Sequence, residues 1–81
     1  MIGLQYILEL EEMTAAELSE KIGVSFSLVY RWLNGKKAIP KQRVIQIHSK
    51  VLPEYPEELI DKEITEADKT ILTNIRLLIP I

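Results

Sequence analysis

The chain has 81 residues, 47% of them hydrophobic, and no cysteine, so we expect one small domain held together by an apolar core, without a disulfide or a thiolate metal site. No apolar run approaches the roughly 18 residues of a membrane span, and the N-terminus has neither the basic region nor the apolar core of a signal peptide; we therefore expect a cytoplasmic protein. The net charge of −2 would argue against a nucleic-acid partner only if the charges were evenly spread.

The charged residues fall into three unlike segments. Residues 1–20 hold five glutamates and no lysine or arginine, which gives −5, and residues 51–81 hold seven acids and three bases, which gives −4. Residues 21–50 hold seven lysines and arginines and no acid, which gives +7. This pattern predicts one positive face, suited to phosphate binding, on a protein that is acidic elsewhere.

The first predicted helix runs from about Gly3 to Glu12. Its buried side is expected to consist of Leu4, Ile7, Leu8 and Met13. The second begins at Thr14, because Thr14 and Glu17 have the spacing of a capping box. Apolar residues at spacings of three and four give this helix one buried face: Ala15, Leu18 and Ile22. Gly23 ends it, since glycine takes the positive φ that a helix end often needs.

A third helix follows at once, with Ser25 as its N-cap and Asn34-Gly35 as its end. Its buried side is expected to hold Val29, Trp32 and Leu33. The opposite side holds Phe26, Ser27, Tyr30 and Arg31. An ordinary pair of antiparallel helices would explain the periodicity and the caps equally well, but it would not explain the placement of charge.

The basic segment continues beyond the third helix. Lys36-Lys37-Ala38 reads as a basic loop, and Pro40 is suited to be the first residue of a fourth helix, where its missing N–H is not needed. The apolar stripe of this helix is predicted to be Val44, Ile47 and Val51, with Lys41 and Arg43 on the solvent side. His48 has no second histidine or cysteine beside it and reads as a packed or surface residue.

Two prolines after Leu52 end the fourth helix. A short helix is then expected from Pro56 to about Lys62, and a last helix, capped by Thr65 and Asp68, to about Ile79. The apolar positions of the last helix are predicted to be Ile64, Ala67, Ile71, Leu72, Ile75, Leu78 and Ile79.

The C-terminal stretch is unusually aliphatic. Seven of the eleven residues from 71 to 81 are leucine or isoleucine, more than one face of a terminal helix can hide on so small a body. We therefore predict a homodimer with an interface at Ile71, Ile75, Leu78 and Ile79. The alternative is that Leu77, Ile79 and Ile81 close the core of the monomer. In the predicted homodimer, residues 1–52 would form the core of the domain, and residues 53–81 a helical extension of the same domain used for dimerisation.

Catalysis has little support in the sequence. A nucleophile needs a base and an orienting group, a metal needs several ligands, and a nucleotide favours a glycine-rich phosphate loop. With three glycines, one histidine and no cysteine, none of these sites can be assembled. We predict no enzyme, no metal and no cofactor.

The run LSEKIGVSFSLVYRWLNGKKAIP, residues 18–40, resembles the helix-turn-helix of the Cro and repressor group, the XRE-like family. The resemblance extends from about Gly3 to Leu52. It implies an all-α domain of five to six helices with the lambda-repressor-like fold, in which the third helix enters the major groove of double-stranded DNA.

The resemblance also implies roles for residues. Four positions of the third helix would face base edges: Phe26, Ser27, Tyr30 and Arg31. Arg31 is the strongest candidate, because its planar fork can donate two hydrogen bonds to guanine. Contacts to phosphate would come from Ser25, Asn34, Lys36, Lys37, Lys41 and Arg43. The competing interpretation is that Phe26 and Tyr30 merely cover the core.

The chain departs from the family pattern at two sites. Members often pair an arginine in the first helix with a glutamate near the end of the third, and the matching positions here are Leu8 and Leu33. Two leucines can preserve that packing, because a shielded ion pair adds little over apolar contacts. Ala15 stands where relatives often place a phosphate-binding glutamine, so binding would depend more on the start of the third helix and on the basic loop.

These features together predict a sequence-specific transcriptional regulator, a repressor of bacterial, phage or plasmid type. It would bind an inverted repeat as a dimer, with its recognition helices about one DNA turn, roughly 34–36 Å, apart. One alternative is an antitoxin-like or adaptor module that binds a protein partner through the C-terminal helix. Another is an architectural DNA-binding factor in recombination or replication.

Overall fold

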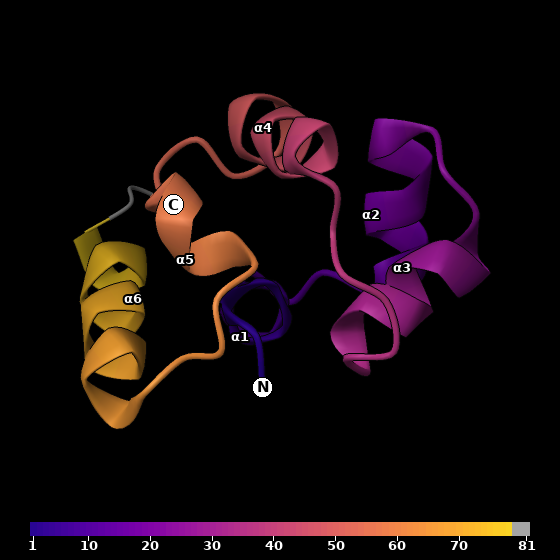
Figure 1. Ribbon diagram of the computed structural model, residues 1–81. Coiled ribbons are helices and arrows are strands. Elements are labelled where there is room, and N and C mark those ends of the chain that lie inside the picture. The colour runs from indigo at the N-terminus through magenta and orange to yellow at the C-terminus, as the bar shows by residue number, and fades with distance from the viewer. Residues whose placement is uncertain (79–81) are drawn as a thin grey trace.

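The computed structural model describes residues 1–78, and over that range the chain forms six α-helices and no β-strand (Figure 1). The helices are α1 (Gly3–Leu10), α2 (Ala15–Ile22), α3 (Phe26–Leu33), α4 (Lys41–Lys50), α5 (Glu57–Ile60) and α6 (Glu66–Leu78). The predicted all-α class is confirmed. Within residues 1–78, no helix has both the length and the apolar character that crossing a membrane requires.

Helix α1 lies near the middle of the molecule and is seen almost end-on in Figure 1. Helix α2 packs against α3 and α4, α5 packs against α1 and α4, and α6 packs against α1. Helices α3 and α6 consequently lie at opposite edges of the molecule, with α1 between them (Figure 1). The Cα positions span 31 × 26 × 20 Å.

The core is built from the apolar stripes of the helices. Eleven predicted core residues are buried: Leu4, Ile7, Leu8, Leu18, Ile22, Val29, Trp32, Val44, Ile47, Ile64 and Leu72. Trp32 is 1% exposed. Its indole N–H is also buried and has no hydrogen-bond partner among residues 1–78, which subtracts roughly 1–3 kcal/mol from what burial of the ring contributes.

Several core residues were not predicted, because they lie in loops or in a helix too short to show a period. They are Ile39, Leu52, Tyr55, Leu59 and Ile60. Burial raises the pKa of the Tyr55 phenol, and so does its hydrogen bond to Glu11. All five belong to the same apolar core as the predicted residues.

The predicted caps are present. The hydroxyl of Thr14 accepts a hydrogen bond from the backbone N–H of Glu17 at 3.1 Å, and the Glu17 carboxylate accepts one from the N–H of Thr14 at 3.1 Å. Thr65 and Asp68 repeat this arrangement at the start of α6, at 3.2 and 3.0 Å. Each pair satisfies two backbone donors that a helix start otherwise leaves unpaired.

The predicted boundaries of three helices were wrong. Helix α5 begins at Glu57, with Pro56 as its N-cap, and ends at Ile60 rather than near Lys62. Helix α1 ends at Leu10 rather than near Glu12, because Glu12 has a φ of 55°, in the left-handed region. Pro40 is the N-cap of α4 rather than its first residue: its ψ of 146° is extended, and its carbonyl already accepts a hydrogen bond from the N–H of Val44 at 3.1 Å. The predicted position of Ile79 lies outside the described residues.

Gly3 allows a close approach between α1 and α5. A Cβ atom at this position would lie 1.7 Å from the carbonyl oxygen of Leu59, so no larger residue fits unless the two helices separate. The N–H of Gly3 also donates a hydrogen bond to the carbonyl of Lys62 at 2.9 Å. This contact fixes the segment that leads from α5 into α6.

Candidate nucleic-acid interface

The turn between α2 and α3 has a fixed geometry. Gly23 has a φ of 73°, and its N–H and that of Val24 both donate to the carbonyl of Ser19, at 2.9 and 3.1 Å. The hydroxyl of Ser25 then caps α3 by accepting a hydrogen bond from the N–H of Leu28 at 3.2 Å. A Schellman-like end followed at once by an N-cap holds the two helices at one angle.

The side of α3 that faces away from the core carries the four predicted base-reading residues. Phe26 and Tyr30 are 51% and 53% exposed, and their ring centroids lie 5.8 Å apart with the planes tilted by 35°. Ser27 and Arg31 are also exposed. The two aromatic rings therefore do not cover the core, and the structure brings all four side chains together on one outward face.

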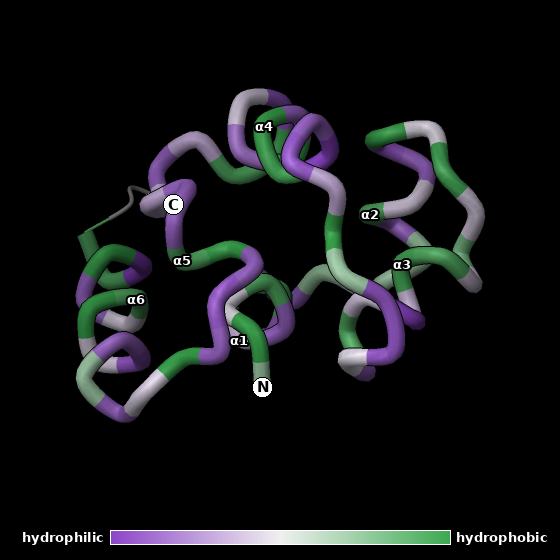
Figure 2. The backbone as a smooth tube through the Cα atoms, viewed as in Figure 1, coloured by the Kyte–Doolittle hydropathy of each residue, from purple (hydrophilic) through white to green (hydrophobic). Residues whose placement is uncertain are grey.

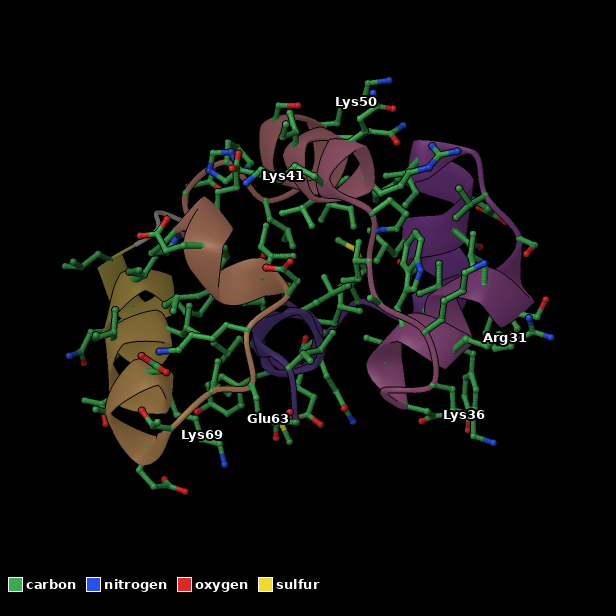
Figure 3. The ribbon with its side chains drawn as sticks, viewed as in Figure 1. Arg31, Lys36, Lys41, Lys50, Glu63 and Lys69 are labelled. Carbon is green, nitrogen blue, oxygen red and sulfur yellow. The ribbon has the colours of Figure 1, made fainter. Side chains whose placement is uncertain are left out.

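The loop after α3 presents two cations beside that face. Gly35 has a φ of 72°, and the backbone N–H groups of Lys36 and Lys37 donate to the carbonyl of Arg31 at 2.9 and 3.3 Å. Both lysines and Asn34 are exposed. Figure 3 shows Arg31 and Lys36 projecting outward from the edge formed by α3, and Figure 2 shows the loop as hydrophilic near α3 and hydrophobic closer to α4.

The two predicted phosphate contacts on α4 are engaged with other side chains. The ammonium of Lys41 lies 3.2 Å from the carboxylate of Glu57 at the start of α5, and Lys41 lies between α4 and α5 in Figure 3. The guanidinium of Arg43 donates to the side-chain carbonyl of Gln46 at 2.7 Å. Residues 21–50 contain no acid, but the fold places Glu57 beside Lys41 and so partly neutralises the charge of this lysine.

Gln46 is a residue of this surface that the sequence reasoning missed. Its amide donates to the carbonyl of Ile22 at 3.0 Å while its oxygen accepts from Arg43. One side chain thus fixes the guanidinium of Arg43 and ties α4 to the end of α2. The spacing of three residues between Arg43 and Gln46 within a helix could have indicated the pairing, but the contact with Ile22 crosses 24 positions.

The two departures from the family pattern have simple structural outcomes. Leu8 is 4% exposed, and Leu33 is half-buried against the core, so both leucines pack as apolar residues. Ala15 is half-buried at the start of α2. Its methyl group contributes to packing and offers no hydrogen bond to a phosphate.

No site in residues 1–78 has the composition of a metal centre, since no three histidine, cysteine, aspartate or glutamate side chains lie close enough together to hold an ion. A pocket of about 240 Å³ lies behind the basic loop and is lined by Ile2, Trp32, Gly35, Lys37, Ala38, Ile39 and Asp61. This volume is below the roughly 300–1,000 Å³ of typical small-molecule sites. A second pocket of about 550 Å³ lies on α4, but its lining of Pro40, Gln42, Arg43 and Gln46 is mainly polar, whereas such sites are mostly apolar.

The comparison with known families places these elements in context. The sequence model of the helix-turn-helix family matches residues 4–59, a range that runs from α1 into α5. Helix α6 lies beyond the matched residues. No curated protein matches the chain. No solved structure matches it either.

Proposed function

The chain belongs to the helix-turn-helix family of the Cro and repressor type, a DNA-binding regulator family, and from this premise we propose that it is a sequence-specific transcriptional repressor that binds an inverted repeat as a homodimer. The observation that carries the proposal is the outward face of α3. Four exposed side chains gather there, with Arg31 among them, and the cations of the following loop lie beside them.

Arg31 reads a guanine in this proposal. It is exposed near the end of α3, and its planar fork matches O6 and N7 of guanine in the major groove. Phe26 and Tyr30 would contact thymine methyl groups, since apolar surface is the partner that those groups favour. Ser27 would complete the base contacts near the start of the helix.

Phosphate contacts fix the register of α3 in the groove. Lys36, Lys37 and Asn34 are exposed beside it and would make the principal contacts together with the start of α3, where Ser25 is the cap. Arg43 would contribute from α4 while Gln46 holds it in place. Lys41 contributes less, because Glu57 shares its charge.

The proposed dimer uses the exposed apolar residues of α6. Ile71 is 49% exposed, Leu77 is 77% exposed and Leu78 is 82% exposed, whereas Ile75 packs against the core. Burying one such side chain contributes roughly 1.5–3 kcal/mol, so the exposed parts in two copies offer roughly 6–12 kcal/mol. Association costs about 4–15 kcal/mol, and we therefore expect a weak dimer that DNA strengthens.

In this proposal, residues 1–52 provide DNA binding and residues 53–81 provide dimerisation within one domain. The protein would act in the cytoplasm of a bacterial or phage-infected cell, where the operator DNA is accessible. Its repressor role would follow from occupying a site that overlaps a promoter.

A second candidate function is a protein-binding module of the antitoxin or adaptor kind. The exposed leucines of α6 favour it, because a hetero-partner could cover them instead of a second copy. This alternative predicts that DNA binding is weak and indifferent to sequence.

The experiment that tests the proposal is selection from a random duplex pool at near-physiological salt, run in parallel on the native protein and on Arg31→Ala. We expect the native protein to enrich an inverted repeat. The variant should lose about 1–3 kcal/mol of discrimination at one base per half-site and keep the others. Uniform weakening at every position would make Arg31 a phosphate contact. Absence of enrichment with the native protein would favour the protein-binding module.

A further inference from the structure

The inward side of α6 packs and hydrogen-bonds against the rest of the monomer. Leu72 is buried, and the hydroxyls of Tyr6 and Thr73 lie 2.8 Å apart. The guanidinium of Arg76 lies 3.3 Å from the carboxylate of Glu11 and donates to the carbonyl of Leu10 at 3.3 Å. These contacts fix the rotation of α6 on α1, so the opposite side of the helix is held facing outward.

The outward side of α6 carries no charge from residue 67 to residue 78. Its exposed residues are Ala67, Thr70, Ile71, Asn74, Leu77 and Leu78. They recur at spacings of three and four and form a continuous stripe along the helix. We call this set the α6 stripe. The C-terminal turns of α6 are mainly hydrophobic in Figure 2.

An uncharged stripe is unusual for this protein. Charged residues are exposed on each of the helices α1 to α5, for example Glu9 on α1, Glu20 on α2 and Lys50 on α4. In α6 the exposed charge is that of Glu66 in the first turn, and Lys69 lies 3.4 Å from its carboxylate. Lys69 and Arg76 are turned to the half-buried flank, where they also contact Tyr6 and Glu11. Soluble monomers rarely leave such a contiguous apolar surface uncovered.

We propose that the α6 stripe pairs with the same stripe of a second copy in antiparallel orientation, with the two-fold axis at Asn74. The proposal rests on the homodimer of the proposed function and specifies how that dimer is built. An isologous contact must be complementary to itself, and a stripe without charge meets that condition because it brings no like charges together.

Asn74 distinguishes the antiparallel arrangement. With the axis at Asn74, Ile71 of each copy lies against Leu77 of the other, and the two Asn74 amides meet. A side-chain amide both donates and accepts hydrogen bonds, so the Asn74 side chains of the two copies can hydrogen-bond to each other. A parallel pair would instead place two Glu66 carboxylates and two positive helix N-termini side by side, which is unfavourable. In this register the other polar residue of the stripe, Thr70, lies against Leu78 of the second copy, so only Asn74 meets its own counterpart. A polar residue at such a seam specifies register.

The position of α6 in the fold also sets the spacing of the two recognition helices. Because α1 lies between α6 and α3 (Figure 1), at least two helix-packing steps of roughly 8–10 Å separate them. The two-fold axis lies a further half step beyond α6, so each α3 is roughly 20–25 Å from the axis. The two recognition helices of the dimer are therefore roughly 40–50 Å or more apart. This exceeds one DNA turn of about 34–36 Å. At about 3.4 Å per base pair, this distance corresponds to half-site centres roughly 12–15 base pairs apart. The α6 dimer therefore predicts a spacing wider than the one turn, about 10–10.5 base pairs, expected from the sequence.

The first test measures association without DNA. Sedimentation equilibrium is run on the native protein, on Ile71→Glu and on the matched control Ile45→Glu, since Ile45 on α4 is similarly exposed at 46%. We expect a concentration-dependent dimer for the native protein and the control, and at least tenfold weaker association for Ile71→Glu. A monomeric native protein at several hundred micromolar, or equal association of all three, would overturn the proposal.

The second test measures orientation, and the absence of cysteine from the chain makes it direct. Asn74→Cys and Ala67→Cys are oxidised separately under the same conditions. Antiparallel pairing predicts a disulfide dimer for Asn74→Cys alone, since only residues at the axis approach their own copy within about 7 Å. Cross-linking at both positions would indicate parallel pairing, and cross-linking at neither would remove α6 from the interface.

The third test separates failure of this inference from failure of the proposed function. Binding is measured on duplexes with a single half-site and on duplexes with two half-sites whose centres lie one turn or roughly 12–15 base pairs apart. We expect Ile71→Glu to bind the single half-site like the native protein, and the native protein to bind cooperatively only at the wider spacing. Cooperative binding at one turn would overturn the α6 dimer while leaving DNA binding intact. If the native protein does not bind even the single half-site, the proposed function itself is contradicted.

Discussion

Helices α3 and α6 both expose large apolar side chains, but those of α3 lie among positive charges and those of α6 lie on an uncharged surface. Phe26 and Tyr30 on α3 are 51% and 53% exposed, close to Arg31 and the lysines of the following loop. Leu77 and Leu78 on α6 are 77% and 82% exposed in a stripe without charge. The apolar exposure is comparable in kind, and the charges around it differ.

This difference teaches that exposed apolar area alone does not identify a partner. Cations beside aromatic rings suit a polyanion whose bases offer methyl groups and planar edges. An uncharged aliphatic stripe suits another apolar surface. The helix-turn-helix match covers α3 and leaves out α6, so the two faces can be tested by substitutions that disturb one and spare the other.

The largest expected effects come from the residues that anchor each helix to the shared core. Trp32→Ala removes the anchor of α3 and should lower the free energy of unfolding by about 3–5 kcal/mol, and Leu72→Ala removes that of α6 at a cost of about 2–5 kcal/mol. Both side chains are almost fully buried. Urea denaturation followed by circular dichroism measures both changes. The exposed control Leu77→Ala should stay within about 0.5 kcal/mol.

Leu72→Ala also tests whether the two faces belong to one cooperative unit. The variant keeps Trp32, the single tryptophan of the chain, whose fluorescence reports on α3. We expect the fluorescence and circular dichroism transitions to coincide at a lower urea concentration. A fluorescence transition unchanged from the native protein, with an earlier loss of helical signal, would mean that α6 unfolds separately.

The next effect in size concerns the loop beside α3. Replacing Lys36 and Lys37 by alanine should weaken binding to one half-site about 30-fold at 0.15 M salt, roughly five-fold per phosphate contact, and reduce the salt slope by about two. Titrations at several salt concentrations measure both quantities. The matched control replaces Lys62 and Lys69, which lie on the α6 side, and should leave the slope unchanged. An equal loss in the control would mean that net charge alone governs binding.

The smallest effects come from the two capping boxes, which occur once in each region. Thr14→Ala and Thr65→Ala should each cost about 1 kcal/mol of stability. Only Thr14→Ala should also weaken DNA binding, because α2 supports the turn into α3. Thermal melts and single half-site titrations compare the two variants. Equal effects of both on DNA binding would mean that the caps act only through overall stability.

The same caps give the protein an acid sensitivity. The hydrogen bond from the Thr14 backbone lowers the pKa of Glu17, and that from the Thr65 backbone, with Lys62 beside it, lowers the pKa of Asp68. The folded state therefore binds these protons more weakly than the unfolded state. The contribution is complete above the ordinary carboxyl pKa values of about 4 and is lost as the pH falls through the lowered folded values.

A series of Tm measurements from pH 7 to pH 3 checks this sign. We expect Glu17→Gln and Asp68→Asn to lower Tm at pH 7 and to flatten its fall below pH 4. A variant that melts in parallel with the native protein over the whole range would show that its carboxyl does not contribute to the acid sensitivity.

The features near one another in the chain were predictable from the sequence. Capping boxes span three residues, the turn at Gly23 is local, and the period of 3.6 residues separates Trp32 from Tyr30 on α3. Each depends on backbone geometry within a turn or two of helix. The outward face of α3 could therefore be predicted residue by residue, together with the all-α class.

Contacts between distant segments were decided by the tertiary structure. The contact of Gly3 with Leu59, the neutralisation of Lys41 by Glu57 and the tie of Gln46 to Ile22 join residues that no local period relates. The sequence of α6 contains more aliphatic residues than one face can hold, so periodicity could not choose among them. Packing on α1 made that choice: Leu72 is buried, and Leu77 and Leu78 are left outside, because only the assembled core defines which side of a helix it can cover.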